Sequence, residues 1–450
     1  MSRMTSRTSP MAVTRRQVGA LAAAAGTMGL AACTGGSSRG GGGSRRAGIR
    51  FLYATGDETW NEVVQGVVDA FNERSETAEI QLDPLPSGSD YATALRTMDA
   101  TGNWPAIVDM RDTATYISAG KLSAIPESVT DLLDPDAIGA AEDGEIYTVP
   151  SSALNGEIGL NIVYDKDYFE EHGLAVPTTY DEFIALLDEI KGNGDAPLAT
   201  AAGEVWPSDQ LWKPLAAPMF ATYSDAGGFW NALGDGEAAI EDLREPLERL
   251  KTITDGYVLD GWQSTEDAQT TTLLVNGQTI MATSSAGIGR LHDIAKVDPE
   301  FNAGLFIIPA DDGSIPVLKD DVNGDSASGL AISKQAEDDG LPYEAAVEFL
   351  EFYYSVECAD IIESFGWIAP NIKKADEITR NEEIPGAQDY FALLENPELT
   401  WYGNDPRYEN FSAFDSFFRQ SRIEFQDGQA TLEETLAKVE AEFESLVDES

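Results

Sequence analysis

The sequence predicts an α/β fold made of two lobes. Stretches with strand-like alternation of apolar residues are repeatedly followed by stretches with a helical stripe. Strands that alternate with helices form a mostly parallel sheet whose two faces are covered by those helices. After the N-terminal region about 400 residues remain, which is too long a chain for one hydrophobic core.

The first strand and helix are predicted directly after residue 48. Apolar residues recur at alternate positions from Ile49 to Tyr53, and Gly56-Asp57 ends this pattern. The next apolar residues are spaced by three and four, which predicts an amphipathic helix: Trp60, Val63, Val64, Val67 and Phe71. Two further strands are expected at 80–82 and 107–108, with a helix over 91–100 between them.

The second half of the chain continues the same alternation, without an internal repeat. Residues 158–163 are typical of a strand, and a capping box at Thr179 and Glu182 predicts the start of a helix. Lys191-Gly192 suits the end of that helix. Thr431 and Glu434 begin the final helix in the same way.

The first 32 residues are typical of an export signal. Arg15 and Arg16 precede an apolar stretch, 18–32, that is too short to span a bilayer. The paired arginines resemble a twin-arginine signal, which implies export of an already folded protein. Leu30-Ala31-Ala32-Cys33 resembles a lipobox, in which Cys33 is lipidated and becomes the mature N-terminus; the alternative is a chance cysteine. Residues 33–47 then form a Gly/Ser-rich tether to the outer face of the membrane.

The chain is strongly acidic. Its formal charge is −49, and removing residues 1–32 takes away four arginines and no acids, leaving −53. Such an excess of carboxylates repels nucleic acid and anionic lipid. The balance resembles that of proteins from salt-loving organisms, although a merely acidic exported protein is the alternative.

The remaining cysteine favours a structural role. If Cys33 is lipidated, Cys358 has no partner, and it lies in step with Ile361, Ile362 and Phe365 at helical spacing. A buried thiol is therefore expected rather than a nucleophile. His172 and His292 have no metal-binding or triad motif around them, there is no Gly-x-Ser-x-Gly elbow, and no paired carboxylates of a glycoside hydrolase stand out. We expect no enzyme activity, metal or cofactor.

The order of motifs over about residues 48–447 resembles the family 1 extracellular solute-binding proteins of ABC importers, of the sugar-type, maltose-binding-protein-like group. The motifs that carry the resemblance are Gly56-Asp57-Glu58; Ala100-Thr101-Gly102-Asn103-Trp104-Pro105; Ala119-Gly120-Lys121-Leu122; Gly144-Glu145-Ile146-Tyr147-Thr148-Val149-Pro150; Tyr164-Asp165-Lys166-Asp167-Tyr168-Phe169; Gly173-Leu174; Pro177-Thr178-Thr179-Tyr180; Asn276-Gly277-Gln278-Thr279-Ile280-Met281; and Phe425-Gln426-Asp427-Gly428. The chain departs from the family at Ala106, where an aspartate is usual, and at Ile288 to Arg290, where an aromatic is usual.

The resemblance implies a periplasmic-binding-protein-like fold of type II. Two α/β lobes are joined by a hinge that the chain crosses several times, near 150–156 and 325–329, with the ligand in the cleft between them. Lobe one would comprise 48–154 plus 328–372, and lobe two 155–327 plus 373–450. Capture by domain closure would deliver the ligand to the permease, which works with a cytoplasmic ATPase, and the protein itself is expected to be a monomer.

Loops that follow strands are where a ligand cleft is expected. Sugars need planar polar groups and aromatic platforms. Trp206 stands in a polar loop where the family carries a stacking aromatic, whereas Trp212 and Trp230 have apolar surroundings and are expected in cores. Arg290 could bind sugar hydroxyls or clamp the carboxylate of an acidic sugar. The predicted ligand-binding residues are Asp57, Glu58, Arg111, Asp112, Ser151, Trp206, Asp209, Trp262, Ser285, Arg290 and Trp367.

Several alternatives stay open from the sequence. Asp57 and Glu58 also suit a solvated helix start, and Arg111 could pair with a neighbouring acid. Trp262, Trp367 and Trp401 suit hinge or domain packing as well as a cleft. A sugar is the preferred ligand, but a polyamine or sugar acid is the alternative, as is a role as a retained sensor.

Overall fold

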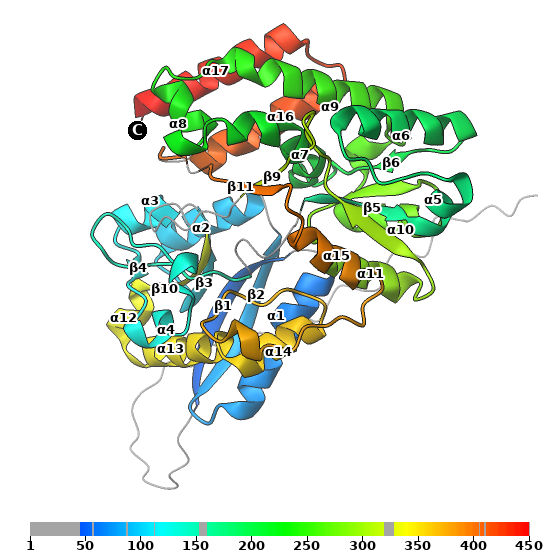
Figure 1. Cartoon of the computed structure of the whole chain (residues 1–450). Coiled ribbons are helices and arrows are strands. Elements are labelled where there is room, and N and C mark those ends of the chain that lie inside the picture. Colours follow the sequence, from blue (N-terminus) through cyan, green and yellow to red (C-terminus); the bar gives the residue numbers. More distant parts are fainter. Residues whose placement is uncertain are drawn as a thin grey trace, which may run out of the picture. The chain divides into compact units, whose positions relative to one another are not determined.

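The computed structural model describes residues 46–55, 58–86, 89–111, 113–152, 160–318, 328–404, 406–408 and 411–449 (Figure 1). Contacts divide the chain into Met1–Ser44 and Arg45–Ser450, and only the second unit contains described residues. The predicted export signal, Cys33 and most of the tether therefore lie outside the described residues. In the part of the chain that the structure covers, every helix is too short or too polar to cross a membrane.

The first sheet has five strands in the order β2-β1-β3-β10-β4. Strand β1 (Ala47–Thr55) runs parallel to β2 (Ala78–Pro86) and β3 (Ile107–Met110). Strand β10 (Gly329–Ser333) comes from much later in the chain and lies antiparallel between β3 and β4 (Leu122–Ser123). The predicted strands of this region are confirmed.

Helices cover both faces of the first sheet. Ile49, Phe51 and Tyr53 of β1 belong to the core beneath α1, α13 and α14, whereas Leu52 and Ala54 belong to the core beneath α2 and α3. The alternation predicted from the sequence therefore has a physical basis, because each face has its own apolar partner. The helices around this sheet are α1 (Glu58–Arg74), α2 (Ser89–Thr101), α3 (Thr113–Ser118), α4 (Glu127–Thr130), α12 (Lys334–Asp339), α13 (Leu341–Tyr353) and α14 (Val356–Ser364).

The second sheet has four strands in the order β6-β7-β5-β8. Strand β5 (Asn161–Asp165) runs antiparallel to both β7 (Met281–Ser284) and β8 (Ala303–Phe306), and only β6 (Leu198–Ala199) and β7 are parallel. The expectation of a mostly parallel sheet is wrong for this sheet. The sequence spacing shows that helices intervene, but it does not show in which direction the chain enters the next strand.

Helices also cover both faces of the second sheet, because Ile162 and Tyr164 join one core and Val163 joins the other. The helices of this part are α5 (Lys166–His172), α6 (Tyr180–Asn193), α7 (Asp209–Ala221), α8 (Phe229–Gly234), α9 (Arg244–Tyr257), α10 (Asp267–Val275), α11 (Ile288–Val297), α15 (Ala387–Leu394), α16 (Phe411–Gln426) and α17 (Leu432–Glu449). Two further strands, β9 (Ile315–Leu318) and β11 (Leu399–Tyr402), form a small parallel sheet below α7 and α16 (Figure 1).

Of the two predicted capping boxes, the one at Thr431 and Glu434 forms in full and the one at Thr179 and Glu182 forms in part. The Thr431 hydroxyl accepts from the N–H of Glu434, and the Glu434 carboxylate accepts from the N–H of Thr431. At α6 the Thr179 hydroxyl accepts from the N–H of Glu182, but the Glu182 carboxylate reaches one residue further and binds the N–H and hydroxyl of Thr178. These contacts satisfy backbone donors that a helix start leaves unpaired.

The chain passes between the two sheets at adjacent positions. Val149 and Leu330 exchange backbone hydrogen bonds of 2.7 and 3.0 Å, so the outgoing chain and the returning chain lie side by side. The hydroxyls of Tyr353 and Tyr354 donate to the carbonyls of Ser151 and Pro150. Residues 153–159 and 319–327, which contain most of the two predicted crossings, lie outside the described residues.

Candidate ligand-binding site

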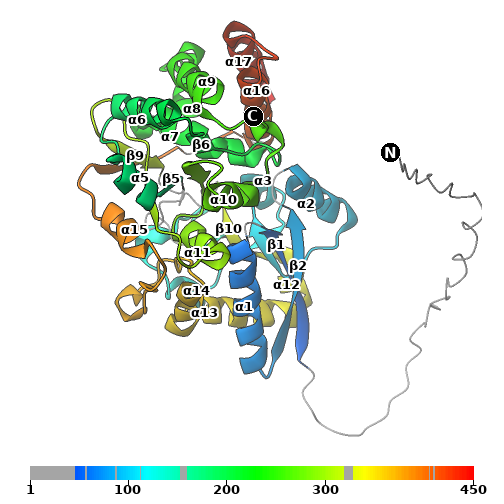
Figure 2. The same ribbon diagram turned by 90° about the vertical axis from the view of Figure 1, so that its right-hand side faces the viewer.

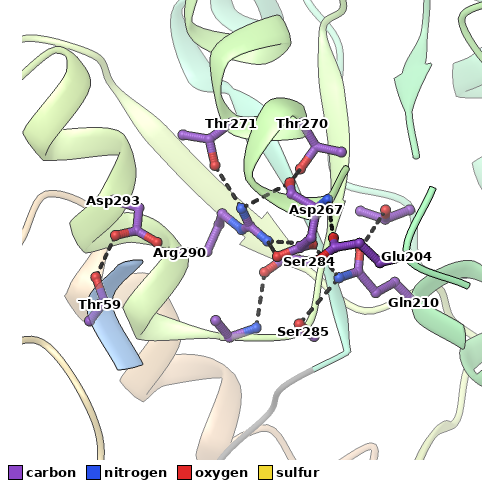
Figure 3. Close-up of polar contacts among 12 residues, drawn as sticks. Thr59, Glu204, Gln210, Asp267, Thr270, Thr271, Ser284, Ser285, Arg290 and Asp293 are labelled. Carbon is purple, nitrogen blue, oxygen red and sulfur yellow. Dashed lines mark hydrogen bonds and ion pairs between the residues drawn. The ribbon is translucent and has the colours of Figure 1, made fainter. Parts of the chain in front are cut away.

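A buried polar network lies at the carboxyl end of β7 (Figure 3). The guanidinium of Arg290 donates from Nη2 to both carboxylate oxygens of Asp267, at 2.7 and 2.8 Å, and from Nη1 to the Thr271 hydroxyl. The side-chain amide of Gln210 donates to Asp267 and to the Ser285 hydroxyl. The network therefore links α7, α10 and α11 beneath the loop that carries Ser285.

Arg290 and Asp267 are almost fully buried, with side chains 1% and 5% exposed. A charge at this depth is stable only when its partner is present and well oriented. Arg290 was expected to bind sugar hydroxyls or to clamp a ligand carboxylate; in the structure its Nη2 is bonded to Asp267 and its Nη1 to Thr271.

Trp206 follows a strained turn. Val205 has φ 68° and ψ −55°, and the turn is closed by a 2.9 Å hydrogen bond from the Trp206 N–H to the Glu204 carbonyl. A β-branched residue rarely adopts positive φ, and such strain tends to persist where a functional geometry requires it. The Glu204 carboxylate accepts from the Asp267 N–H at 2.9 Å (Figure 3), so the buried network anchors the turn that presents the half-buried Trp206.

Val205→Gly tests the role of this turn. We expect a free energy of unfolding within about 1 kcal/mol of the parent, because relief of about 1–3 kcal/mol of strain offsets the entropy that glycine adds to the unfolded chain. Ligand affinity should fall about two- to tenfold, because Trp206 must then be immobilised on binding. Urea denaturation and calorimetric titration measure both effects. Val258, at the end of α9 with an ordinary φ of −86°, provides the matched control, and Val258→Gly should only destabilise.

A pocket of about 130 Å³ opens between α7, α16 and the segment after β11. Six of its thirteen lining residues are aromatic, four are ionic, one is an amide and two are aliphatic. The lining residues are Asp209, Trp212, Lys213, Phe220, Trp230, Leu318, Tyr402, Asn404, Pro406, Phe411, Asp415, Phe418 and Arg422. Aromatic rings with a few convergent polar groups are typical of a small-molecule site.

Asp209 is the first residue of α7 and the only member of the predicted set that lines this pocket. Its carboxylate accepts from Arg422 at 2.5 Å and from Arg419 at 2.8 Å, and Lys213 lies 3.4 Å away. Burial opposes its ionisation, but attraction from Arg419, Lys213 and Arg422 outweighs burial and lowers the pKa of Asp209 well below its ordinary value. Asp209 is thus an ionised carboxylate already engaged by protein cations.

On the first sheet, Arg111 extends from the carboxyl end of β3. Its side chain is 49% exposed and donates to the buried carboxylate of Asp109 at 2.9 Å. Asp109 also accepts from the Ala54 N–H, at 3.3 Å. The expected pairing of Arg111 with a neighbouring acid is therefore present, and it leaves an oriented, solvent-accessible guanidinium at the strand ends.

The two sheets are connected where the N-terminal end of α1 meets α11 (Figure 2). The Thr59 hydroxyl donates to the carboxylate of Asp293 (Figure 3), and Lys296 pairs with Glu62. Nearby, Trp367 packs so closely on Gly289 that a Cβ there would lie 2.7 Å from its ring. Trp367 therefore lies in the packing between α1 and α11 and also contacts Trp60.

The remaining predicted residues differ in their surroundings. Trp262 is buried, and its carbonyl accepts from the Ala202 N–H. Ser151 lies half-buried at the crossing, and Ser285 lies half-buried above the buried network. Asp57, Asp112 and the side chain of Glu58 lie outside the described residues. Trp212 and Trp230 are buried in one core, as predicted, although both also line the pocket, and Cys358 is confirmed as a buried free thiol.

The predicted ligand-binding set does not contain the residues of α16 and of the segment before it that line the pocket, including Tyr402, Asn404 and Arg422. The sequence contained an indication of this site. Arg419 and Arg422 are three residues apart, on one face of a predicted helix, and phenylalanines recur at helical spacing along the same helix. Within the described ranges, no group of three or more His, Cys, Asp or Glu side chains is placed to hold a metal ion.

Comparison with known proteins gives consistent matches. Residues 54–357 match the family profile described as bacterial extracellular solute-binding protein. The multiple sugar-binding protein of Streptococcus mutans is 23% identical over 57% of this chain and 61% of its own length. A probable sugar-binding periplasmic protein of Mesorhizobium japonicum is 25% identical over 51% of this chain and 55% of its own length. The chain thus spans only part of these relatives.

The fold also matches solved structures. A chitin oligosaccharide binding protein superimposes with a TM-score of 0.73 at 18% identity, over 90% of this chain and 99% of that one. A sugar transporter protein from Bacillus licheniformis in complex with stachyose gives a TM-score of 0.69 at 18% identity, over 89% of this chain and all of that one. At this identity the likeness establishes the periplasmic-binding-protein-like α/β fold.

Proposed function

The chain belongs to the family of bacterial extracellular solute-binding proteins, and from this premise we propose that it captures a carbohydrate outside the cell and delivers it to an ABC importer. Family membership makes it a binding protein rather than an enzyme. The observation that carries the carbohydrate proposal is the pocket of about 130 Å³, because its aromatic rings and convergent polar groups suit the faces and edges of a sugar ring. The sugar-binding names of similar proteins support the same ligand class.

We propose a contact set revised by the structure. Outside the pocket, Trp206 would supply an aromatic platform, Ser285 a hydroxyl and Arg111 an exposed guanidinium. Ser151 lies at the crossing, and Trp367 lies in the packing between α1 and α11. Asp209, Trp262 and Arg290 are better explained as structural, because each is buried and already bonded to protein groups. Asp57, Glu58 and Asp112 remain candidates from the sequence.

The proposed mechanism is domain closure. The first lobe would comprise 48–154 plus 328–372 and the second 155–327 plus 373–450, so that each contains one large sheet. A ligand that touches both lobes stabilises the closed arrangement by its differential affinity. The Thr59–Asp293 and Glu62–Lys296 contacts join the two lobes beside the crossing. They would limit how the lobes can move relative to each other. The permease would then recognise the closed protein, which acts as a monomer.

A ligand screen tests the function. Thermal denaturation in high salt, with neutral mono- and oligosaccharides, sugar acids and polyamines, should show stabilisation by at least one carbohydrate. Small-angle scattering should then show a smaller radius of gyration with that carbohydrate than without it. Stabilisation by polyamines alone, or by no carbohydrate, would reject the proposal.

We further propose attachment to the outer face of the cell membrane through Cys33. Cys33→Ser should move the protein from the membrane fraction to the soluble fraction of the producing cells, because the lipid is the anchor. Immunoblots of the two fractions measure the change. Thr34→Ser is the matched control and should leave the protein in the membrane fraction; a membrane-bound Cys33→Ser protein would contradict the anchor.

A further inference from the structure

We propose that the pocket between α7 and α16 accepts a sugar ring that carries a negatively charged group, such as the carboxylate of an acidic sugar. The inference rests on the proposed carbohydrate function and narrows its ligand class. It depends on the charge balance of the pocket, on an arginine whose hydrogen bonds are incomplete and on the size of the space.

The ionic groups that line the pocket are two carboxylates, Asp209 and Asp415, and two cations, Lys213 and Arg422, and a third cation, Arg419, is bonded to both carboxylates beside the pocket. Three cations and two carboxylates form one connected cluster, in which Asp209 bonds Arg422, Arg419 and Lys213, and Asp415 bonds Arg419 at 2.5 Å. The three cations keep the pKa of Asp209 low despite its burial, so the carboxylate stays ionised. Among the described residues this cluster, Arg419 included, carries one more positive than negative charge, in a chain whose formal charge is −49.

The incomplete hydrogen bonding of Arg422 is the main support for an anionic ligand. The Arg422 side chain is 1% exposed, and among the described residues only its Nη2 has a hydrogen-bond partner, Asp209. Nε and Nη1 are buried and have no partner in the described part of the chain, and the guanidinium lies 4.8 Å from the Trp212 ring centre and 4.7 Å from that of Phe418. Buried donors of this kind are rare because each unmade hydrogen bond is costly. An anionic acceptor entering the pocket would satisfy them.

Lys213 and Asn404 add recognition at the mouth of the pocket. The Lys213 side chain is 33% exposed and lies one helical turn from Asp209, so its ammonium can meet an entering carboxylate. The side-chain oxygen of Asn404 is buried, has no hydrogen-bond partner among the residues that the structure describes, and can accept from a ligand hydroxyl. Charge and hydroxyl recognition would thus lie on opposite walls, α7 and the segment after β11.

The space suits one ring. Its volume of about 130 Å³ is close to the roughly 150 Å³ of a protein cavity that holds benzene. The rings of Trp212, Trp230 and Phe411 would face the C–H groups of the sugar. A neutral sugar would leave Nε and Nη1 of Arg422 without a charged acceptor, although Nη2 is bonded to Asp209.

Calorimetric titration with matched sugars tests the inference. The probes are D-galacturonate against D-galactose, D-glucuronate against D-glucose, and tri-galacturonate against galactotriose. We expect one acid to bind at least tenfold more tightly than its neutral counterpart, with an affinity that falls as salt is raised. Lys213→Met should weaken binding of that acid about tenfold and binding of the neutral sugar by a clearly smaller factor.

Controls separate this inference from the proposed function. Lys251 pairs with Asp255 at the same i, i+4 spacing on α9, outside the pocket, so Lys251→Met should change neither affinity. Binding of neutral sugars without preference for the acids, or equal losses for both in Lys213→Met, would overturn the inference and leave the carbohydrate function intact. Binding of no sugar in the panel would overturn the function itself. Arg422→Met provides a second test. If its far-ultraviolet circular dichroism matches that of the parent, it should also weaken binding of the acid more than binding of the neutral sugar.

Discussion

Trp206→Ala should weaken binding of the captured sugar about tenfold to thirtyfold, which corresponds to roughly 1.4–2 kcal/mol of lost contact with an aromatic platform. The side chain is half-buried in a loop and belongs to no core, so the free energy of unfolding should change by less than about 1 kcal/mol. Calorimetric titration with the carbohydrate found by screening measures the first quantity, and urea denaturation measures the second.

Two variants make this result specific to stacking. Trp206→Phe keeps a ring and should recover most of the affinity. Phe301 is a half-buried aromatic just before β8, at the end of the second sheet opposite to Ser285. Phe301→Ala should therefore leave affinity unchanged. If Trp206→Ala binds as tightly as the parent, the tryptophan is not a ligand platform, and the strained turn before it requires another explanation.

Asp267→Ala should produce the largest loss of stability, about 3–5 kcal/mol, because it leaves the buried Arg290 without its bidentate partner. Gln210 would lose an acceptor at the same time. The midpoint of urea denaturation measures the loss. We also expect weaker ligand binding, because the network supports the turn before Trp206 and the loop of Ser285.

The double variant Asp267→Leu with Arg290→Met distinguishes an unpaired charge from lost packing. It removes both charges, so it should be clearly more stable than Asp267→Ala alone. The exposed pair Arg407 and Asp235 provides a surface control, and Asp235→Ala should cost less than about 1 kcal/mol. A double variant no more stable than the single one would show that polar bonds, rather than charge burial, dominate at this position.

The parts of the fold that could be predicted from the sequence are those determined by local pattern. The stripe from Trp60 to Phe71 and the capping box at Thr431 predicted helices that the structure contains, because periodicity and capping act within a few residues. The direction of β5 could not be predicted in this way. Its antiparallel pairing depends on β7 and β8, which lie more than a hundred residues later in the chain.

The candidate site shows the same limit more sharply. Asp209 and Arg290 are charged residues in stretches of sequence where the family binds its ligand. The sequence alone cannot show that both are already paired with other residues of the protein. The partners of Asp209 are 210 and 213 residues away, on α16, and that of Arg290 is 23 residues away, on α10. Trp206 could be identified from the sequence because a tryptophan between polar residues is unusual in itself, whatever residues it contacts in the fold.

The position of β10 has a consequence for how the protein is made. This strand comprises residues 329–333 but lies inside the first sheet, between β3 and β4, and the core beneath α1 also needs residues 345–372. A nascent chain that has produced only the first three strands therefore lacks an interior strand and much of the covering layer. The first sheet and its core therefore stay incompletely folded until residue 372, a little over four fifths of the chain, has been synthesised. Export after folding, which the paired arginines at residues 15 and 16 predict, would let this delayed assembly finish in the cytoplasm before the protein meets its membrane.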